Sequence, residues 1–185
     1  MKDDYVSASD ALEKLEAGNL SYLNLEIGSG DISREKRIQT SKEGQKPYAV
    51  IITCSDSRVI PESIFSAGIG ELFVVRVAGN VIDNYQLGSI EYAIEHLGCR
   101  LVVVLGHTQC GAVSAATHKN KGYISYITDE IKQAIGEETD PIKACILNIE
   151  RSVAKIQKSL DTVDGLQIIG ALYHTDSGVV DFEIN

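Results

Sequence analysis

The chain has 185 residues, of which 44% are apolar, and this suits one packed globular domain. Its formal net charge of −9 leaves no basic stripe to neutralise phosphates, which argues against nucleic-acid binding and against an anionic membrane surface. No apolar run approaches the roughly 18 residues that span a bilayer, and the first residues lack the basic and apolar regions of a secretory signal. We therefore expect a cytoplasmic protein whose four cysteines stay reduced.

The N-terminal part is expected to be a helical arm. Residues 7–17 have a helical pattern, Ser7 with Asp10 resembles a capping box, and Gly18 stands where a helix stop belongs. Residues 19–46 carry many charges and several glycines, which favours irregular or short helical surface structure. We assign residues 1–46 to the arm and residues 47–185 to the core of one single domain.

From residue 48 onward, strand and helix patterns alternate. Short β-branched runs predict strands at 48–53, 72–77, 101–105 and 166–173. Helical patterns lie between and after them, at 61–67, 85–97, 124–135 and 141–160. This alternation predicts an α/β domain with a mostly parallel sheet of about four strands and helices on both faces. Residues 179–182 can return as an edge strand.

Three potential metal ligands follow the carboxyl ends of predicted strands. Cys54 directly follows the first strand, His107 follows the third, and Cys110 begins the next helix. The carboxyl ends of parallel strands meet at one rim of the sheet, where ligands bind. Zinc accepts thiolate and imidazole ligands in a tetrahedron, and three protein ligands leave one position open, as in catalytic sites. We predict one zinc ion per chain, held by these residues.

The other two cysteines are interpreted as core residues. Cys99 precedes the third strand, and five strand residues alone place it about 17 Å from the rim where His107 lies. Cys145 falls near the apolar stripe of the last helix. Both are expected to behave as small buried hydrophobic side chains.

Asp56 and Arg58 come soon after Cys54. The simplest interpretation is a salt bridge within a turn, which contributes under about 1 kcal/mol. A functional interpretation is that an ionised Asp56 accepts a hydrogen bond from hydroxide on the metal. Arg58 would then keep Asp56 ionised and hold it off the open coordination position by a bidentate contact.

These residues resemble the two signatures of the β-class carbonic anhydrases. The matching segments are Cys54-Ser55-Asp56-Ser57-Arg58 and His107-Thr108-Gln109-Cys110-Gly111, with further likeness at 73–76, 78–80 and 89–93 and a weaker one at 170–173. The resemblance implies reversible hydration of carbon dioxide to bicarbonate and a proton, with zinc-bound hydroxide as the nucleophile. It also implies a homodimer or a dimer-based tetramer in which the N-terminal helices embrace the partner.

The resemblance further assigns a substrate pocket. It matches Gln45 to a glutamine that hydrogen-bonds a substrate oxygen, and it matches Phe73, Ala78 and Tyr92 to residues that line the carbon dioxide site. His96 is a candidate to relay the proton, although its helix position suits a surface residue equally well.

One subclass of the family is gated by bicarbonate and has a tryptophan three residues before the first zinc cysteine. This chain has Ile51 at that position and no tryptophan, although Arg76 matches another gate residue. We therefore expect the plant-like subclass with an open site.

Three alternatives stay open at this point. The same zinc site can hydrolyse carbon disulfide or carbonyl sulfide. Without a metal, Cys54 can act as a nucleophile with His107 as its base and Asp56 orienting that base. Finally, the zinc site can be a scaffold without catalysis.

Overall fold

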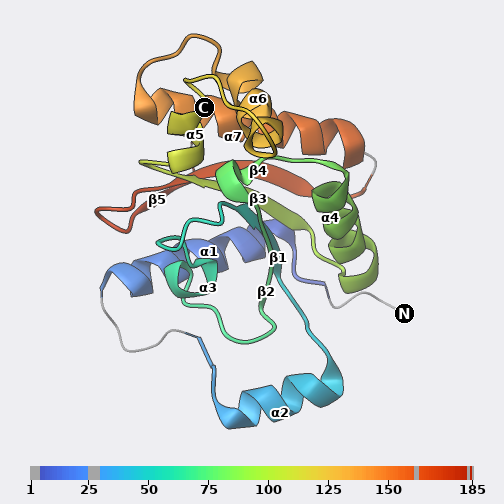
Figure 1. Cartoon of the computed structure of the whole chain (residues 1–185). Helices are drawn as coiled ribbons and strands as arrows, with labels where there is room; N and C mark the ends of the chain where they lie inside the picture. Colours follow the sequence, from blue (N-terminus) through green and yellow to red (C-terminus); the bar gives the residue numbers. More distant parts are fainter. Residues whose placement is uncertain (1–4, 25–29, 161–162, 183, 185) are drawn as a thin grey trace.

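A five-stranded sheet forms the centre of the computed structural model, which describes residues 5–24, 30–160, 163–182 and 184. The strand order is β2-β1-β3-β4-β5; β1 to β4 are parallel and β5 is antiparallel to β4. The strands are β1 (Ala49–Thr53), β2 (Leu72–Arg76), β3 (Leu101–His107), β4 (Gln167–Tyr173) and β5 (Val180–Asp181). This confirms the predicted α/β fold, including the edge strand (Figure 1).

Helices cover both faces of the sheet. They are α1 (Ala8–Leu23), α2 (Arg34–Glu43), α3 (Pro61–Ile64), α4 (Asn84–Leu97), α5 (Gly111–Ala115), α6 (Ile124–Ile135) and α7 (Pro141–Leu160), with a 3₁₀ turn η1 at Ala78–Asn80. Val50 and Ile52 of β1 point into the core under α4 to α7, whereas Ala49 and Ile51 point toward α1 and α3. Every residue of β1 and β3 is buried, as expected for parallel strands covered on both sides.

The register of β1 and β3 brings the ends of these two strands together. Thr53, the last residue of β1, pairs with Leu105 in β3. β3 continues two residues beyond the predicted end, so that His107 is its last residue and pairs with Tyr173 of β4. The chain segments that follow β1 and β3 therefore leave the sheet side by side.

The predicted helix stop at Gly18 is wrong, because α1 continues through this residue to Leu23. Gly18 does not end the helix; it allows α1 to pack closely against the backbone at Phe65. An ideal Cβ at Gly18 would lie only 2.0 Å from the carbonyl oxygen of Phe65, and Ser66 Oγ donates a hydrogen bond to the Gly18 carbonyl at 2.9 Å. Sequence patterns do not distinguish these two uses of a glycine.

Only part of the expected N-terminal arm stands away from the core. α1 packs on this chain's own sheet, and the Asn19 amide donates to the carbonyls of Ile64 and Gly178. α2 has no buried residue and stands apart from the sheet in Figure 1. The residues predicted to form irregular or short helical surface structure include the end of α1 and all of α2, which is a short surface helix, while 25–29 lie outside the described residues.

The helix predicted over 61–67 is shorter in the structure. It begins at Pro61 as expected but ends at Ile64, because Ser66 adopts a left-handed backbone conformation with φ of +48°. Among the described residues, no helix is both long and apolar enough to cross a membrane.

We expect the substitution Gly18→Ala to destabilise the protein, because the added methyl group would collide with the backbone at Phe65. The free energy of unfolding should fall by about 1–3 kcal/mol. Urea unfolding followed by circular dichroism measures this difference.

Gly88→Ala in α4 is the matched control, because nothing lies within 4 Å of a Cβ at this position. Alanine in this helix should raise the free energy of unfolding by up to about 1 kcal/mol. Equal stabilisation by both substitutions would contradict the packing of α1 against Phe65.

Candidate metal centre

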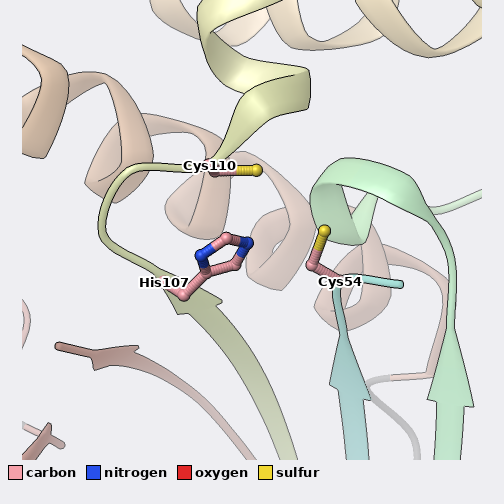
Figure 2. Close-up of side chains that lie close together, drawn as sticks. All are labelled: Cys54, His107 and Cys110. Atoms are coloured by element: carbon pink, nitrogen blue, oxygen red, sulfur yellow. The ribbon is translucent and has the colours of Figure 1, made fainter. Parts of the chain in front are cut away.

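Cys54, His107 and Cys110 converge at the carboxyl edge of the sheet, as predicted. Cys54 follows β1, His107 ends β3, and Cys110 is the N-cap residue of α5. Their ligand atoms all lie within 4.8 Å of one another, and the side chains point toward one another in Figure 2. All three residues are buried, with exposed fractions of 4%, 1% and 3% respectively.

The tautomer of His107 is set by its neighbour. Its Nδ1 lies 2.9 Å from the Thr108 carbonyl oxygen, and since a carbonyl only accepts, Nδ1 carries the proton. Nε2 is buried and has no hydrogen-bond partner among the described residues. Leaving such an atom unpaired is costly, so this orphaned nitrogen beside two sulfurs indicates a metal ligand.

The loop after His107 is held against β4. The Thr108 amide donates to the Tyr173 carbonyl at 2.9 Å, and the Thr108 and Thr175 hydroxyl groups lie 3.1 Å apart. Because Thr108 O orients the histidine ring, these bonds also fix the direction of Nε2.

Hydrogen atoms directed at the Cys54 sulfur stabilise it as a thiolate. The Cys110 thiol makes the largest contribution, and the backbone N–H groups of Gly79 and Asp56, at 3.3 and 3.4 Å, add to it. Together they lower the pKa of Cys54 to about 4, although burial opposes this. The pKa of Cys110 is raised, because its proton is shared with Cys54 and because it is buried. Cys54 is therefore the sulfur that ionises more readily.

This donor set fits zinc. Two sulfurs and one imidazole nitrogen from three separate backbone positions can occupy three vertices of a tetrahedron. Cys145 is buried and lines a cavity of about 520 Å³ together with Cys110, but it is not in the ligand cluster. Cys99 lies at the other end of β3, where its thiol donates to the Pro47 carbonyl at 3.4 Å.

Arg58 donates hydrogen bonds to both carboxylate oxygens of Asp56. Arg58 Nε lies 3.0 Å from Oδ1 and Nη2 lies 2.8 Å from Oδ2, while the Arg58 backbone N–H donates to Oδ1 at 2.9 Å. The Arg58 side chain holds the pKa of Asp56 well below its usual range. Asp56 Oδ2 is 3.9 Å from His107 Nε2, so an ionised carboxylate stands at the edge of the metal cluster.

Two contributions to the site carried no signal in the sequence patterns. The Arg76 guanidinium donates to the carbonyls of Cys54 and Asp56, at 3.2 and 2.8 Å, and so ties the end of β2 to the loop after β1. The Gly79 N–H bond to the Cys54 sulfur depends on the conformation of η1. In the sequence, the two segments show only a resemblance to the family.

The structure brings only one of the four predicted pocket residues near the cluster. Ala78 adjoins Gly79, which contacts Cys54. Gln45 precedes β1 and Phe73 pairs with Val50, about 13 Å along the strand from the rim. Tyr92 packs on Phe73 with ring centroids 6.1 Å apart and is 47% exposed. Within one chain these three side chains lie away from the metal ligands.

The fold and site define an α/β protein with a mostly parallel sheet and a two-cysteine, one-histidine cluster that could hold a metal ion. The family model for carbonic anhydrase matches residues 49–180, which include all three ligands. The chain therefore belongs to the carbonic anhydrase family.

Relatives of known name agree over the segment that holds the site. Carbonic anhydrase 2 of Mycobacterium tuberculosis is 63% identical over 64 residues, which are 35% of this chain and 31% of that protein. The carbonic anhydrase of Synechococcus elongatus is 49% identical over 72 residues, 36% of this chain and 26% of that protein. The chain thus spans about a third or less of the length of these relatives.

Solved structures share the fold. The β-carbonic anhydrase CafA of Aspergillus fumigatus has a TM-score of 0.69 at 27% identity, covering 96% of this chain and 90% of its own. The Coccomyxa β-carbonic anhydrase in complex with acetazolamide has a TM-score of 0.71 at 24% identity, and the match covers 81% of this chain and 78% of the Coccomyxa chain. At 24% identity the second likeness concerns the fold alone.

Replacing Cys54 with serine or His107 with alanine should abolish zinc binding, because each change removes one of three ligands. Cys99→Ser and Cys145→Ser are the matched controls and should retain one zinc ion per chain. Metal quantitation after dialysis measures this, and zinc retained at full stoichiometry by C54S would contradict the ligand assignment.

The Asp56 carboxylate should stabilise the metal-free protein in a pH-dependent way. Its pKa in the folded protein lies below the unfolded value of about 3.9, so the stabilisation is present above that pH and is lost as the pH falls. The advantage of the wild type over Asp56→Asn in the free energy of unfolding should therefore shrink below about pH 4. Urea unfolding at several pH values tests this, and a gap that widens with acidification would be inconsistent with it.

Proposed function

We propose that this protein catalyses the reversible hydration of carbon dioxide to bicarbonate and a proton. The observation that carries the proposal is the buried cluster of Cys54, His107 and Cys110 beside an ionised Asp56. Three ligands leave one coordination position for solvent, and the carboxylate is placed to orient what binds there. Membership in the carbonic anhydrase family supports the same reaction.

One zinc ion per chain would occupy the cluster and, when bound, would act as a Lewis acid that acidifies water at the open position. Asp56 would accept a hydrogen bond from the attacking water and so direct its lone pair toward carbon dioxide. Arg58 keeps Asp56 ionised and fixes its orientation by two side-chain bonds. Asp56 thus acts on the nucleophile, whereas Arg58 acts through Asp56.

We further propose that the site belongs to the open subclass. Both Asp56 oxygens accept hydrogen bonds from Arg58, which restrains the carboxylate from taking the fourth ligand position. Ile51 stands where the gated subclass has tryptophan, so the second part of the gate is missing.

The substrate pocket is proposed to be completed by a second copy of the chain. Gln45, Phe73 and Tyr92 lie away from the cluster of their own chain, and Tyr92 exposes half its surface. A homodimer that faces these residues toward the partner's cluster would supply the amide donor and the apolar wall that the resemblance implies. A dimer-based tetramer remains part of this proposal, since one structural neighbour from Sordaria macrospora is described as tetrameric.

We place the protein in the cytoplasm. Cys54, Cys99, Cys110 and Cys145 are all free in the structure. A reducing compartment keeps thiols available as metal ligands, which supports this location.

The zinc-loaded protein should hydrate carbon dioxide in a stopped-flow assay, and removal of zinc by a chelator should abolish the activity. Asp56→Asn should retain zinc but lose about 100-fold or more in kcat/KM, the lower end of the contribution of a positioned acid–base group. Activity that survives chelation and is lost on alkylation of Cys54 would favour the metal-free nucleophile instead. Turnover of carbon disulfide or carbonyl sulfide but not of carbon dioxide would favour the alternative hydrolase.

A subunit-mixing experiment tests the shared pocket. Gln45→Ala and Cys54→Ser should each be nearly inactive alone. Mixed by unfolding and refolding together, they should regain activity, because one site of the heterodimer combines an intact cluster with Gln45 from the other chain. If Gln45 served its own chain, mixing would restore nothing.

A further inference from the structure

The turn η1 gives the metal cluster a hydrogen bond from a separate segment of the chain. Gly79 N–H donates to the Cys54 sulfur at 3.3 Å, and this contact is buried. The other backbone donor to this sulfur is the Asp56 N–H, only two residues along the same loop. The η1 turn therefore couples Cys54 to the chain segment between β2 and α4.

The conformation of η1 is not one that the chain adopts readily by itself. Gly79 and Asn80 both have left-handed backbone conformations, with φ of +69° and +45°. A Cβ at Gly79 would lie 2.6 Å from Ile131 Cδ1 and 3.1 Å from Ala112 Cβ, so the turn is also packed closely against α5 and α6. Such a conformation persists when the surrounding structure holds it.

Side chains on one face of α7 donate hydrogen bonds to carbonyl groups of this turn and of the residues just after it. Asn148 Nδ2 donates to Gly79 O at 2.8 Å, Ser152 Oγ to Asn80 O at 3.2 Å, and Lys155 Nζ to Ile82 O at 2.6 Å. The three donors follow one another at intervals of four and three residues, which places them on one face of the helix. Asn148 and Ser152 are buried, with exposed fractions of 2% and 4%.

We propose that Asn148 is a positioning residue of the metal centre, acting on Cys54 through Gly79. The Asn148 amide fixes the peptide group on one side of the Gly79 Cα, and the N–H that reaches the Cys54 sulfur lies on the other side. Holding the first group restricts the rotation that would turn the second away. The bond to sulfur draws off negative charge and fixes the direction of the ligand, as outer partners of metal ligands do.

This inference rests on the proposed role of Cys54 as a metal ligand, so zinc binding by the wild type is measured first. Absence of zinc from Cys54 in the wild type would refute the proposed function itself. If the wild type binds zinc, the variants test Asn148 alone.

Asn148→Leu is the test variant and Ser152→Ala is its matched control. Leucine has a similar volume but leaves Gly79 O without its donor. Ser152 holds the next carbonyl of the same turn from the same helix face, but that carbonyl is one residue further from the N–H that reaches the sulfur. The zinc Kd measured by chelator competition should rise 10- to 100-fold in N148L, the usual effect of losing an outer partner of a metal ligand. It should stay near the wild-type value in S152A.

A spectroscopic readout separates this role from simple stabilisation. With cobalt in place of zinc, the sulfur-to-cobalt charge-transfer band should move to longer wavelength in N148L, because the Cys54 sulfur has lost a hydrogen bond. The band should be unchanged in S152A. A folded N148L with wild-type zinc affinity and an unshifted cobalt band would overturn the proposal.

A second route covers the case in which N148L does not fold. Asn148→Ser keeps a small polar side chain that is too short to reach Gly79 O. In protein loaded with ¹¹³Cd, a scalar coupling between cadmium and the Gly79 amide proton reports the N–H···S bond directly. The coupling should be present in the wild type and reduced in N148S. Its absence from the wild type, or equal size in both proteins, would refute the inference.

Discussion

The parallel pairing of β1 with β3 is the constraint on which the site depends. It places the end of β1 beside the end of β3, so a cysteine that follows one strand meets a histidine that ends the other. Both strands are buried on both faces, which leaves no room for a shift of register. The buried strands therefore set the position of the cluster. Cys54 follows β1 directly, and the segments after β1 and β3 supply Asp56, Arg58 and Cys110.

Three side chains of the site are each held by a hydrogen-bond partner outside the ligand cluster. Thr108 O fixes the orientation of the His107 ring, Arg58 fixes the Asp56 carboxylate, and the Gly79 N–H fixes the direction of the Cys54 sulfur. These partners come from different segments, and in each case the bond is made with the backbone or in a bidentate geometry. The arrangement restricts both protonation and direction, which a tetrahedral metal site with one free position requires.

The fold and the meeting of Cys54, His107 and Cys110 were predictable because their signals are local. Runs of β-branched residues mark the strands, and the position of Cys54 and His107 relative to those strands is readable along the chain. The predicted helix stop at Gly18 is wrong because this glycine is needed for close packing against the backbone of Phe65, a contact that no local sequence pattern reports. The roles of Arg76 and Asn148 were missed for the same cause, since each donates to backbone carbonyls distant in sequence. The places of Gln45, Phe73 and Tyr92 in a pocket came from family resemblance alone, and one chain does not assemble them.

The two buried sulfurs of Cys54 and Cys110 have a consequence for metal uptake. A thiol must lose its proton to bind a metal, so any proton held by either sulfur leaves when a cation binds both. Loading of the apoprotein is thus an exchange of protons for a metal ion. Acidic surroundings therefore favour the metal-free cluster, and alkaline surroundings favour the filled one.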